Sequence, residues 1–464
     1  MEPHPVIEPQ RIRTLKDAPV RENGSYVLYW MQQSQRARFN PALELAVREA
    51  NELSLPVLVC FGVTGFPEAN ARHYDFMLQG LAEVEAALDK RGIAFLIAES
   101  PPDELALTLS SKAALAVCDR GYLTIQRHWR DRLAAPIDCR LVQVEGDVVV
   151  PVETASTKHE YAARTLRPKI ERLRDDFIAE LRSGPVKVKA ALSDLSLPRH
   201  SKRLDLKKIP AILDQLKLDM SVGPIRRFAG GEAAARKRLK AFLDRSLSTY
   251  ANGRNKPEAG VASHLSPYLH FGQISPVEIA LAARHAGEGG DNTAAFLEEL
   301  IVRRELAMNH VFFSETYDRY AALPSWARET LETHAGDERP HLYTEAQFEA
   351  GETHDRYWNA AMLEMRATGY MHNHLRMYWG KKVLHWSKTP EEAFDTLLSL
   401  NNRWFIDGRD ANSFTNVSWV FGLHDRPWGR QPVFGTVRTM GPNTFKKFDA
   451  EAYVKTVEKL AAEE

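Results

Sequence analysis

Cysteine is scarce in this chain of 464 residues, which has only Cys60, Cys118 and Cys139, none with the spacing of a metal site. A small, odd number of cysteines argues against a disulfide framework and favours a reducing compartment. No apolar run approaches the roughly 20 residues that span a membrane, and the N-terminal sequence has no apolar segment of signal-peptide length. We therefore expect a cytoplasmic protein without a membrane partner.

An excess of charge of either sign is also missing. The 61 lysines and arginines balance the 61 aspartates and glutamates, so the formal net charge is zero. A polyanion would therefore have to meet a local basic patch, because the field of the whole molecule would not attract it. The length exceeds that of one ordinary core and predicts two domains.

The common glycine-rich phosphate cradles are absent too, since neither G-x-G-x-x-G after a strand nor G-x-x-x-x-G-K-[ST] occurs. Short apolar runs nevertheless alternate with helical patterns, which predicts right-handed crossovers and a mostly parallel sheet. Strands are expected at Tyr26–Met31, Leu55–Phe61, Ala94–Ala98, Ala114–Cys118 and Arg140–Val144, and helices at Pro41–Leu53, Asp75–Gly92, Glu104–Ser111 and Thr124–Ala135. Residues 1–183 are predicted to form a doubly wound, Rossmann-like α/β domain, with residues 1–24 running loosely over its surface. An accessory ligand at the carboxyl ends of its strands and a purely structural role are equally open.

Residues 184–225 are predicted to link this domain to a second one, because prolines punctuate them and the basic run 199–208 is typical of a solvated surface. From residue 226 to 464 strand-like runs are scarce and helical patterns follow one another. Helices are expected at Glu232–Tyr250, Ser275–Ala286, Thr293–Phe313, Thr344–Ala350, Asp355–Thr368, Tyr370–Val383, Pro390–Asn401 and Ala450–Ala462. This all-α domain is large enough to enclose a cofactor.

The stretch from residue 358 to 428 holds six of the nine tryptophans, with Asn, Arg and Asp between them. An indole N–H needs a partner, so this mixture favours a pocket for a flat, polar-edged aromatic molecule over simple core filling, which stays the alternative. Trp379 and Trp386 are seven residues apart on one expected helix, about 10 Å along its axis, and Trp358 lies on the preceding helix. Such a row can pass electrons by hopping, but spacing alone favours an aromatic seam between two helices.

Polar residues of the second half form two further candidate sites. The run SHLSPY, residues 263–268, leads into a helix start, where hydroxyl and N–H groups can bind an anion, although an ordinary N-cap is more common. Tyr250 precedes this run and is a candidate to lay its ring on the same ligand. Arg376 on a helix and Asp407 or Asp410 in the loop IDGRD are candidates for a buried ion pair, which is costly and often kept for function.

Several longer motifs resemble class II cyclobutane pyrimidine dimer (CPD) DNA photolyases. They are ELIVRREL (299–306), YWNAAMLEM (357–365), MYWGKKVLHW (377–386), IDGRD (406–410), VSWVFG (417–422) and HDRPWG (424–429). The run SHLSPYLHFGQIS (263–275) resembles the wider photolyase and cryptochrome superfamily. The resemblance covers nearly the whole chain, including its α/β-then-α order.

This resemblance implies a light-driven lyase that repairs DNA containing cyclobutane pyrimidine dimers. FAD would be bound in the helical domain, and its fully reduced form, FADH−, would donate an electron to a flipped-out dimer and split the cyclobutane ring. A deazaflavin or folate antenna chromophore on the α/β domain is a further expectation, with its identity and presence both open. We expect a monomer.

The resemblance also implies roles for individual residues. Tyr250, Ser263, Leu265 and Ser266 would hold the FAD phosphates and ribityl chain. Arg376 would pair with Asp407 beside the isoalloxazine ring, with Asp410 close by. Asn401 would face flavin N5, with Asn402 as the alternative. These positions make up the predicted cofactor site.

The remaining implied roles concern the lesion and electron transfer. Glu299 would hydrogen-bond the dimer, and Trp419 would form an apolar wall against the flipped bases. Arg254, Arg426 and Trp428 would fill the gap in the duplex and clamp its backbone. Trp379, Trp358 and Trp386 would carry electrons, in that order from flavin to surface, and this replaces the aromatic-seam interpretation.

Three other functions are alternatives to repair. A cryptochrome-like blue-light photoreceptor would share the flavin and the tryptophans. A photolyase for (6-4) lesions would use a histidine pair, for which His264, His372 and His374 are candidates, but the flanking motifs fit class II better. A light-independent flavin-binding or DNA-binding module would not need Glu299, Asn401 and the three tryptophans together.

Overall fold

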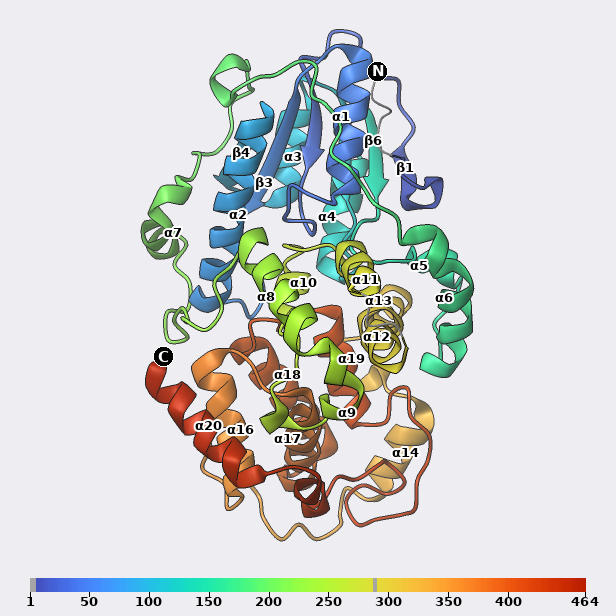
Figure 1. Cartoon of the computed structure of the whole chain (residues 1–464), viewed down its shortest axis with the longest axis vertical. Helices are drawn as coiled ribbons and strands as arrows, with labels where there is room; N and C mark the ends of the chain where they lie inside the picture. Colours follow the sequence, from blue (N-terminus) through green and yellow to red (C-terminus); the bar gives the residue numbers. More distant parts are fainter. Residues whose placement is uncertain (1–5, 287–289) are drawn as a thin grey trace.

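A computed structural model describes residues 6–286 and 290–464 of the chain. Two layers lie one above the other, a sheet flanked by helices that contains the N-terminal half and an assembly of helices that ends with the C-terminus (Figure 1). The predicted fold class, an α/β domain followed by an all-helical domain, is confirmed. The domain boundaries at residues 183 and 225 stay a prediction.

The sheet has six strands in the order β1-β6-β5-β2-β3-β4. All neighbouring strands are parallel except β1, which pairs antiparallel with β6. The strands are β1 (Ile12–Lys16), β2 (Tyr26–Trp30), β3 (Val57–Val63), β4 (Ala94–Glu99), β5 (Ala113–Asp119) and β6 (Arg140–Val144). Because strand side chains alternate between faces, Val27 and Tyr29 pack towards one helix layer, and Tyr26, Leu28 and Trp30 pack towards the other.

Two helices cover each face of the sheet. Helices α1 (Pro41–Leu53) and α2 (Ala71–Arg91) share one apolar cluster with the sheet, and α3 (Pro102–Ser110) and α4 (Thr124–Ala134) share the other. Local sequence sets their ends. Asn40 caps α1 by accepting the N–H of Leu43 at 3.0 Å, and Gly92 ends α2 in the left-handed region, at φ 73°.

One expectation about the α/β half was wrong. Residues 12–16 are not loose, because they form β1 at the edge of the sheet; residues 1–5 of that expected surface segment lie outside the described part. The lysines and arginines of residues 199–208 are exposed, as predicted, while Leu204 and Leu206 between them are buried in a core shared with the sheet. The Leu204 N–H donates to the Ile97 carbonyl at 2.9 Å, so this segment runs along the outer edge of β4.

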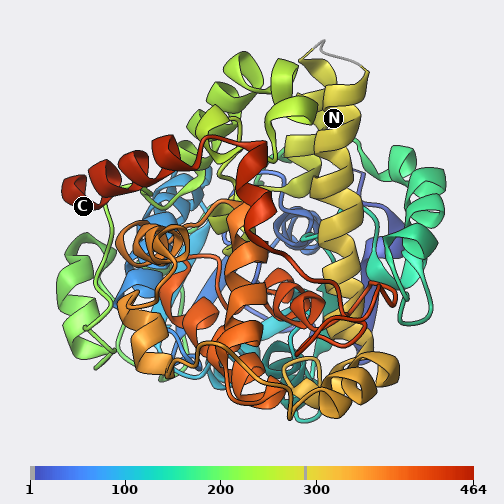
Figure 2. The same ribbon diagram turned by 90° about the horizontal axis from the view of Figure 1, so that it is seen from below.

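The helices of the C-terminal half gather beneath the sheet in Figure 1, and they lie in front in Figure 2, which is seen from below. They are α8 (Glu232–Arg245), α9 (Tyr250–Gly253), α10 (Ser266–His270), α11 (Pro276–His285), α12 (Asp291–Leu297), α13 (Arg304–Phe313), α14 (Ser325–Thr333), α15 (Glu345–Ala350), α16 (Arg356–Thr368), α17 (Asn373–Trp386), α18 (Pro390–Trp404), α19 (Ala411–Val420) and α20 (Ala450–Glu463). The expected single helix Thr293–Phe313 is instead α12, a π-helical segment Glu298–Arg303 and α13. The helix α10 begins in the run SHLSPY, where a helix start was expected. The helices α14 and α19, and α5 (Val152–Ala155), α6 (Ala163–Phe177) and α7 (Ile209–Gln215) before them, were not predicted.

Buried charges join the two halves of the chain. Arg36, after β2, donates to the carbonyls of Gly272 at 3.0 Å and Gly146 at 2.7 Å. Arg304 on α13 pairs with Asp147 at 3.0 Å. Gly272 has a positive φ and would place a Cβ 1.8 Å from the Gln33 carbonyl oxygen, so only glycine fits there. These contacts fix the α/β layer against the helical layer.

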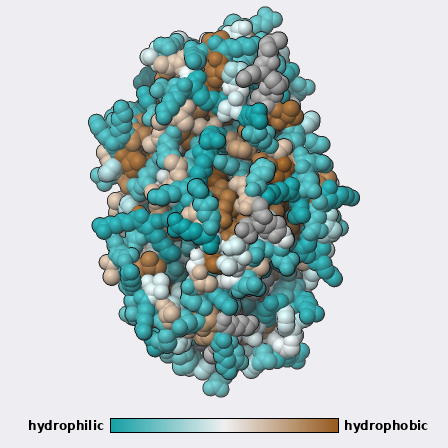
Figure 3. All heavy atoms as spheres, viewed as in Figure 1, coloured by the Kyte–Doolittle hydropathy of each residue, from teal (hydrophilic) through white to brown (hydrophobic). Residues whose placement is uncertain are grey.

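The molecular surface in Figure 3 is mostly hydrophilic, with apolar residues in small patches. Within residues 6–286 and 290–464, no helix has both the length and the apolarity that crossing a membrane requires.

Candidate functional site

The loop that follows α18 carries a predicted ion pair, and the structure forms it. Arg376 Nη2 lies 3.1 Å and 3.2 Å from the two carboxylate oxygens of Asp407. The Arg376 guanidinium also stacks 3.8 Å from the ring centre of Phe405. A Cβ on Gly408 would come within 2.8 Å of the Asn401 carbonyl, so glycine permits the tight loop that places Asp407. Both partners are largely buried, which strengthens the interaction.

The two neighbouring asparagines at the end of α18 differ in what they contact. Asn402 donates to Glu68 at 2.5 Å and accepts the N–H of Arg409 at 2.9 Å. Asn401 donates to the Asn402 side-chain oxygen at 3.0 Å. Within the described residues no hydrogen bond reaches the Asn401 side-chain oxygen. Asn402 therefore fixes the loop, and Asn401 keeps an acceptor for another group.

Three tryptophans form a continuous row across α16 and α17. The rings of Trp379 and Trp358 are 6.5 Å apart between centres and nearly parallel, at 16°. The rings of Trp358 and Trp386 are 6.1 Å apart. The Trp358 indole N–H donates to the Trp379 carbonyl at 3.1 Å, which fixes the first pair. The near end of the row is close to the ion pair, because Trp379 also contacts Phe405 at 6.3 Å.

The far end of this row was expected to reach the surface, but it does not. Trp386 is only 1% exposed. Tyr343 and His354 cover it, with ring centres 5.8 Å and 4.8 Å from the indole, and the Tyr343 hydroxyl and His354 Nδ1 lie 2.8 Å apart. Tyr343 lies just before α15, and His354 lies in the loop after it. Sequence reasoning missed this pair because both residues lie outside the tryptophan-rich stretch.

The loop before α10 lies beside the ion pair. Leu265 is buried, Ser263 half-buried and Ser266 exposed. His264 between them has φ 52°, and its ring contacts Tyr370 at 4.7 Å, which in turn lies 5.7 Å from the Arg376 guanidinium. Burial lowers the pKa of His264 to about 3, so the ring is neutral at neutral pH.

The two other histidines that a (6-4) photolyase would need serve local structure. The His372 ring accepts the His374 N–H at 3.3 Å and caps α17. His374 Nε2 lies 2.7 Å from the Thr444 hydroxyl. His372 also lies near the ion pair, because the Arg376 N–H donates to its carbonyl at 3.0 Å.

Asp410 faces a different space from Asp407. It caps α19 by accepting the N–H of Asn412 at 2.8 Å, and its other oxygen lies 3.2 Å from His270 Nδ1. The interaction with His270, despite burial, lowers the pKa of Asp410 to about 2. Of the predicted cofactor residues, only Asp410 lines the cavity between the two halves.

That cavity lies at the carboxyl ends of β2, β3 and β5, and together with the solvent space at its mouth it takes up about 990 Å³. Apolar and aromatic side chains line much of it, with an edge-to-face contact between Phe66 and Trp129 at 6.1 Å. The Gln32 side-chain nitrogen and the Gln35 side-chain oxygen are buried there and have no hydrogen bond within the described residues. The place agrees with the rule that parallel sheets bind ligands at their carboxyl edge.

A second group of predicted residues surrounds the π-helical segment. Glu299 lies in it and forms an ion pair with Arg254, with both side chains about one third exposed. The Tyr250 side chain also hydrogen-bonds Arg254, and its ring packs against Phe296 at 5.5 Å. A π-helical turn is rare and occurs often at functional sites. Tyr250 thus lies beside Glu299 and Arg254.

A third group forms a surface of aromatic and cationic side chains after α19. The Arg438 guanidinium lies 5.7 Å from the Trp419 ring and 4.2 Å from the Trp428 ring. The Arg426 guanidinium lies 5.2 Å from the centre of the Trp428 ring, and Trp428 is 40% exposed. Asp425 holds Arg438 at 2.9 Å. Arg438 was missed, because no motif distinguishes it from other basic residues.

The chain is similar over nearly its whole length to several known proteins. A deoxyribodipyrimidine photo-lyase of Methanothermobacter thermautotrophicus is 44% identical over 467 residues, which covers 99% of this chain and 100% of that protein. Those of Potorous tridactylus and Arabidopsis thaliana are each 36% identical, over 97% and 98% of this chain and 84% and 94% of theirs. A profile described as DNA photolyase matches residues 27–187.

The chain belongs to the DNA photolyase family. Solved structures support the same fold for this photolyase-family chain. A class III photolyase from Agrobacterium tumefaciens is 20% identical, with a TM-score of 0.70 over 94% of this chain and 86% of that one. A cryptochrome from Synechocystis is 17% identical, also with a TM-score of 0.70, over 93% of this chain and 88% of that one. At these identities the likeness concerns the fold alone.

Proposed function

We propose that this protein is a light-driven lyase that repairs cyclobutane pyrimidine dimers in DNA and uses FAD. The observation that carries the proposal is the row of three tryptophans that leads, through Phe405, to the Arg376–Asp407 pair. Near-full-length relatives named deoxyribodipyrimidine photo-lyase support the same function.

The residues around the ion pair suit a flavin. The Trp379 indole nitrogen and His264 Nδ1 are buried and have no hydrogen bond within the described residues. Both are therefore free to hydrogen-bond a bound cofactor. Arg376 and Asp407 would lie beside the isoalloxazine ring, and the Asn401 oxygen would accept from its N5 position. The loop of Ser263, Leu265 and Ser266 would hold the phosphates and ribityl chain. Asp410 belongs to this set only as a neighbour, because its side chain faces the other cavity.

When bound in its fully reduced form, FAD would supply the light-driven electron that splits the cyclobutane ring. The protein's own contribution is an environment for that chemistry. The Arg376 charge is held by Asp407 at 3.1 Å, and Trp379 and Phe405 exclude water from one side. Trp379, Trp358 and Trp386 would return the cofactor to its reduced form by carrying electrons inward.

The lesion would be met by the second and third groups of residues. Glu299 would exchange its contact with Arg254 for hydrogen bonds to the dimer, which frees the Arg254 guanidinium for a phosphate. Trp419 would stack against the flipped bases, since stacking tolerates any sequence. Arg426 and Trp428 on the exposed loop would fill the gap in the duplex, and Arg438 would hold both indoles in place.

The cavity between the two halves suits an antenna chromophore of the deazaflavin or folate type. Both are flat, largely apolar rings with polar edges, and the cavity joins aromatic walls to Gln32 Nε2 and Gln35 Oε1, which have no hydrogen bond within the described residues. The expected accessory ligand would then lie at the carboxyl edge of the sheet.

A repair assay tests the proposal. The purified, fully reduced protein is mixed with an oligonucleotide that carries one thymine dimer, and the sample is divided between blue light and darkness. Chromatography should show thymines restored only in the light. Bound, fully reduced FAD without any repair would contradict the proposal and favour a cryptochrome-like photoreceptor.

A further inference from the structure

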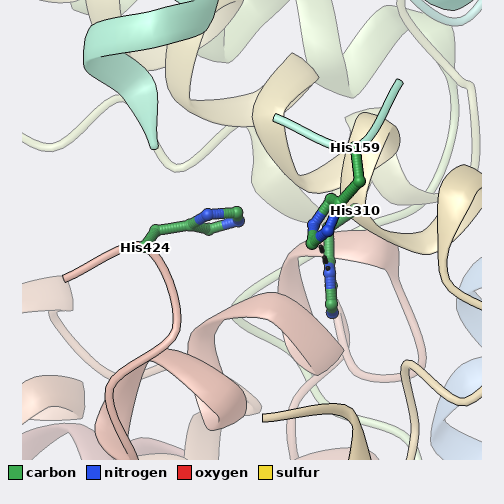
Figure 4. A group of neighbouring side chains, drawn as sticks. All are labelled: His159, His310 and His424. Carbon is green, nitrogen blue, oxygen red and sulfur yellow. Dashed lines mark hydrogen bonds between the residues drawn. The ribbon is translucent and has the colours of Figure 1, made fainter. Parts of the chain in front are cut away.

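Three histidines from separate segments meet on one side of the helical half (Figure 4). His159 is exposed and lies between α5 and α6, His310 is buried on α13, and His424 is half-buried in the loop after α19. One ring nitrogen from each of the three lies within 4.8 Å of the other two. The ring centres are 5.1 Å, 5.8 Å and 5.9 Å apart.

Two of the three histidines have a ring nitrogen without a partner within the described residues. His424 Nδ1 lies 2.9 Å from the Tyr161 carbonyl, which can only accept, so Nδ1 carries the hydrogen and Nε2 carries a lone pair. His424 Nε2 is buried and has no partner within the described residues, and the same holds for His310 Nε2. His310 Nδ1 and His159 Nε2 share one hydrogen bond at 3.1 Å. A carbonyl that orients one ring nitrogen while the other is left open is the usual arrangement of a metal-binding histidine.

Hydrogen bonds fix the three segments against each other. Asn309, next to His310, accepts the N–H of Glu160 at 2.7 Å and donates to the Lys158 carbonyl at 3.0 Å, so it holds the chain on both sides of His159. The Tyr161 hydroxyl donates to the Asp425 carbonyl at 2.8 Å, beside His424. The three rings are therefore brought together by the backbone and do not depend on contact between the rings.

The chemistry of the donors also suits a metal, because all three side chains offer imidazole nitrogens. Glu160, next to His159 in the chain, is already bound by Ser156 at 2.5 Å and by Lys169, and does not add an oxygen ligand. Neutral imidazoles without carboxylates select zinc and similar transition metals over magnesium and calcium.

We propose that His159, His310 and His424 bind one divalent transition-metal ion, with Zn²⁺ as the natural candidate and water as the fourth ligand. With Zn–N bonds of about 2.0–2.1 Å, tetrahedral ligands lie roughly 3.4 Å apart. The nitrogens must therefore approach from separations of up to 4.8 Å, and the exposed His159 side chain can move to allow it. The ion would tie the loop of Arg426 and Trp428 to α13 and to the segment before α6. The binding itself does not depend on repair activity.

The test uses full-length, tag-free protein freed of metal with a chelator and titrated with Co²⁺, and then with Zn²⁺ as competitor. One Co²⁺ per chain with visible d–d absorption, displaced by Zn²⁺ but not by Mg²⁺, is expected. His159→Gln, His310→Gln and His424→Gln should each weaken binding by about 100-fold or more. The control His285→Gln changes an exposed histidine on α11 and should bind as the wild type does.

His159→Gln is the decisive variant, because its side chain is exposed and folding does not depend on it. Circular dichroism of each variant confirms that loss of binding is not loss of fold. Absence of the d–d bands in the wild type, or bands that survive in His159→Gln and His424→Gln, would overturn the proposal. In that case water molecules would hydrogen-bond His310 Nε2 and His424 Nε2.

Discussion

Trp379 connects two parts of the molecule that have different tasks. Its ring stacks on Trp358 and contacts Phe405, and the guanidinium of Arg376 stacks on Phe405 in turn. Its own N–H has no partner among the described residues. A residue that only filled the core would usually satisfy that N–H, because an unpaired buried donor costs about 1–3 kcal/mol.

We expect Trp379→Phe to slow photoreduction of oxidised flavin strongly and to leave repair by chemically pre-reduced protein nearly intact. Phenylalanine keeps most of the packing but is far harder to oxidise, so electron flow stops while the pocket persists. Transient absorption and the repair assay measure the two activities separately. Trp404→Phe is the matched control, because Trp404 contacts Glu349 at 2.9 Å and lies outside the row. Equal loss of both activities in Trp379→Phe would refute the electron-transfer role.

Asn401 and Asn402 are distinguished by their hydrogen bonds. Asn402→Ala leaves the Arg409 N–H and Glu68 without their buried partner, and should lower the free energy of unfolding by about 1–3 kcal/mol. Asn401→Ala removes one hydrogen bond and should cost only about 0.5–1.5 kcal/mol, but should change which flavin redox state accumulates in light. Urea unfolding and absorption spectra measure these effects. A change of flavin state in Asn402→Ala alone would reverse the assignment.

At the scale of elements, the central strands and most helices could be predicted because local sequence signals mark where they begin and end. Buried apolar runs, Pro41 at a helix start and Gly92 at a helix end act within a few residues. β1 was missed because IRTLK becomes a strand only by pairing with the distant β6. The π-helical turn at Glu299 was missed because an extra residue in a turn leaves the helical pattern almost unchanged.

The α13 helix carries a buried acid that should make stability depend on pH. Burial raises the pKa of Glu305 to about 8, above its ordinary value of 4.5, although its carboxyl accepts the N–H groups of Val149 and Val150. Between these values the folded state holds a proton that the unfolded state has lost. The free energy of unfolding should therefore fall as pH rises from 5 to 8, by up to about 4 kcal/mol from this group.

Glu305→Gln cannot titrate, so its stability should change less over the same pH range. Urea unfolding at pH 5 and pH 8 gives the difference for each protein. Glu104→Gln, on the exposed side of α3, is the control and should follow the wild type. If Glu305→Gln has the same pH dependence as the wild type, Glu305 is not the titrating group.

At the scale of the whole molecule, the functional site depends on groups that converge from distant segments. The Arg376–Asp407 pair could be predicted because its partners occur in short motifs and opposite charges in a core must meet. Arg438, Tyr343 and the three histidines could not, since each acquires its neighbours only when separate loops come together. Asp410 could not be separated from Asp407 by sequence, although the loop turns their side chains towards different spaces.

The neutral net charge makes a specific prediction about DNA binding. Because the 61 positive and 61 negative residues cancel, attraction to DNA must come from local groups such as Arg426 beside Trp428. Each phosphate contact contributes about 0.9 to the slope of log K against log salt concentration, so Arg426→Gln should reduce that slope by about 0.9. Fluorescence anisotropy with dimer-containing duplex at several salt concentrations measures it. Arg203→Gln, on the segment along β4 and paired with Glu85 at 2.7 Å, should leave the slope unchanged. An equal reduction in both variants would mean that the overall charge, and not the loop at Arg426, governs binding.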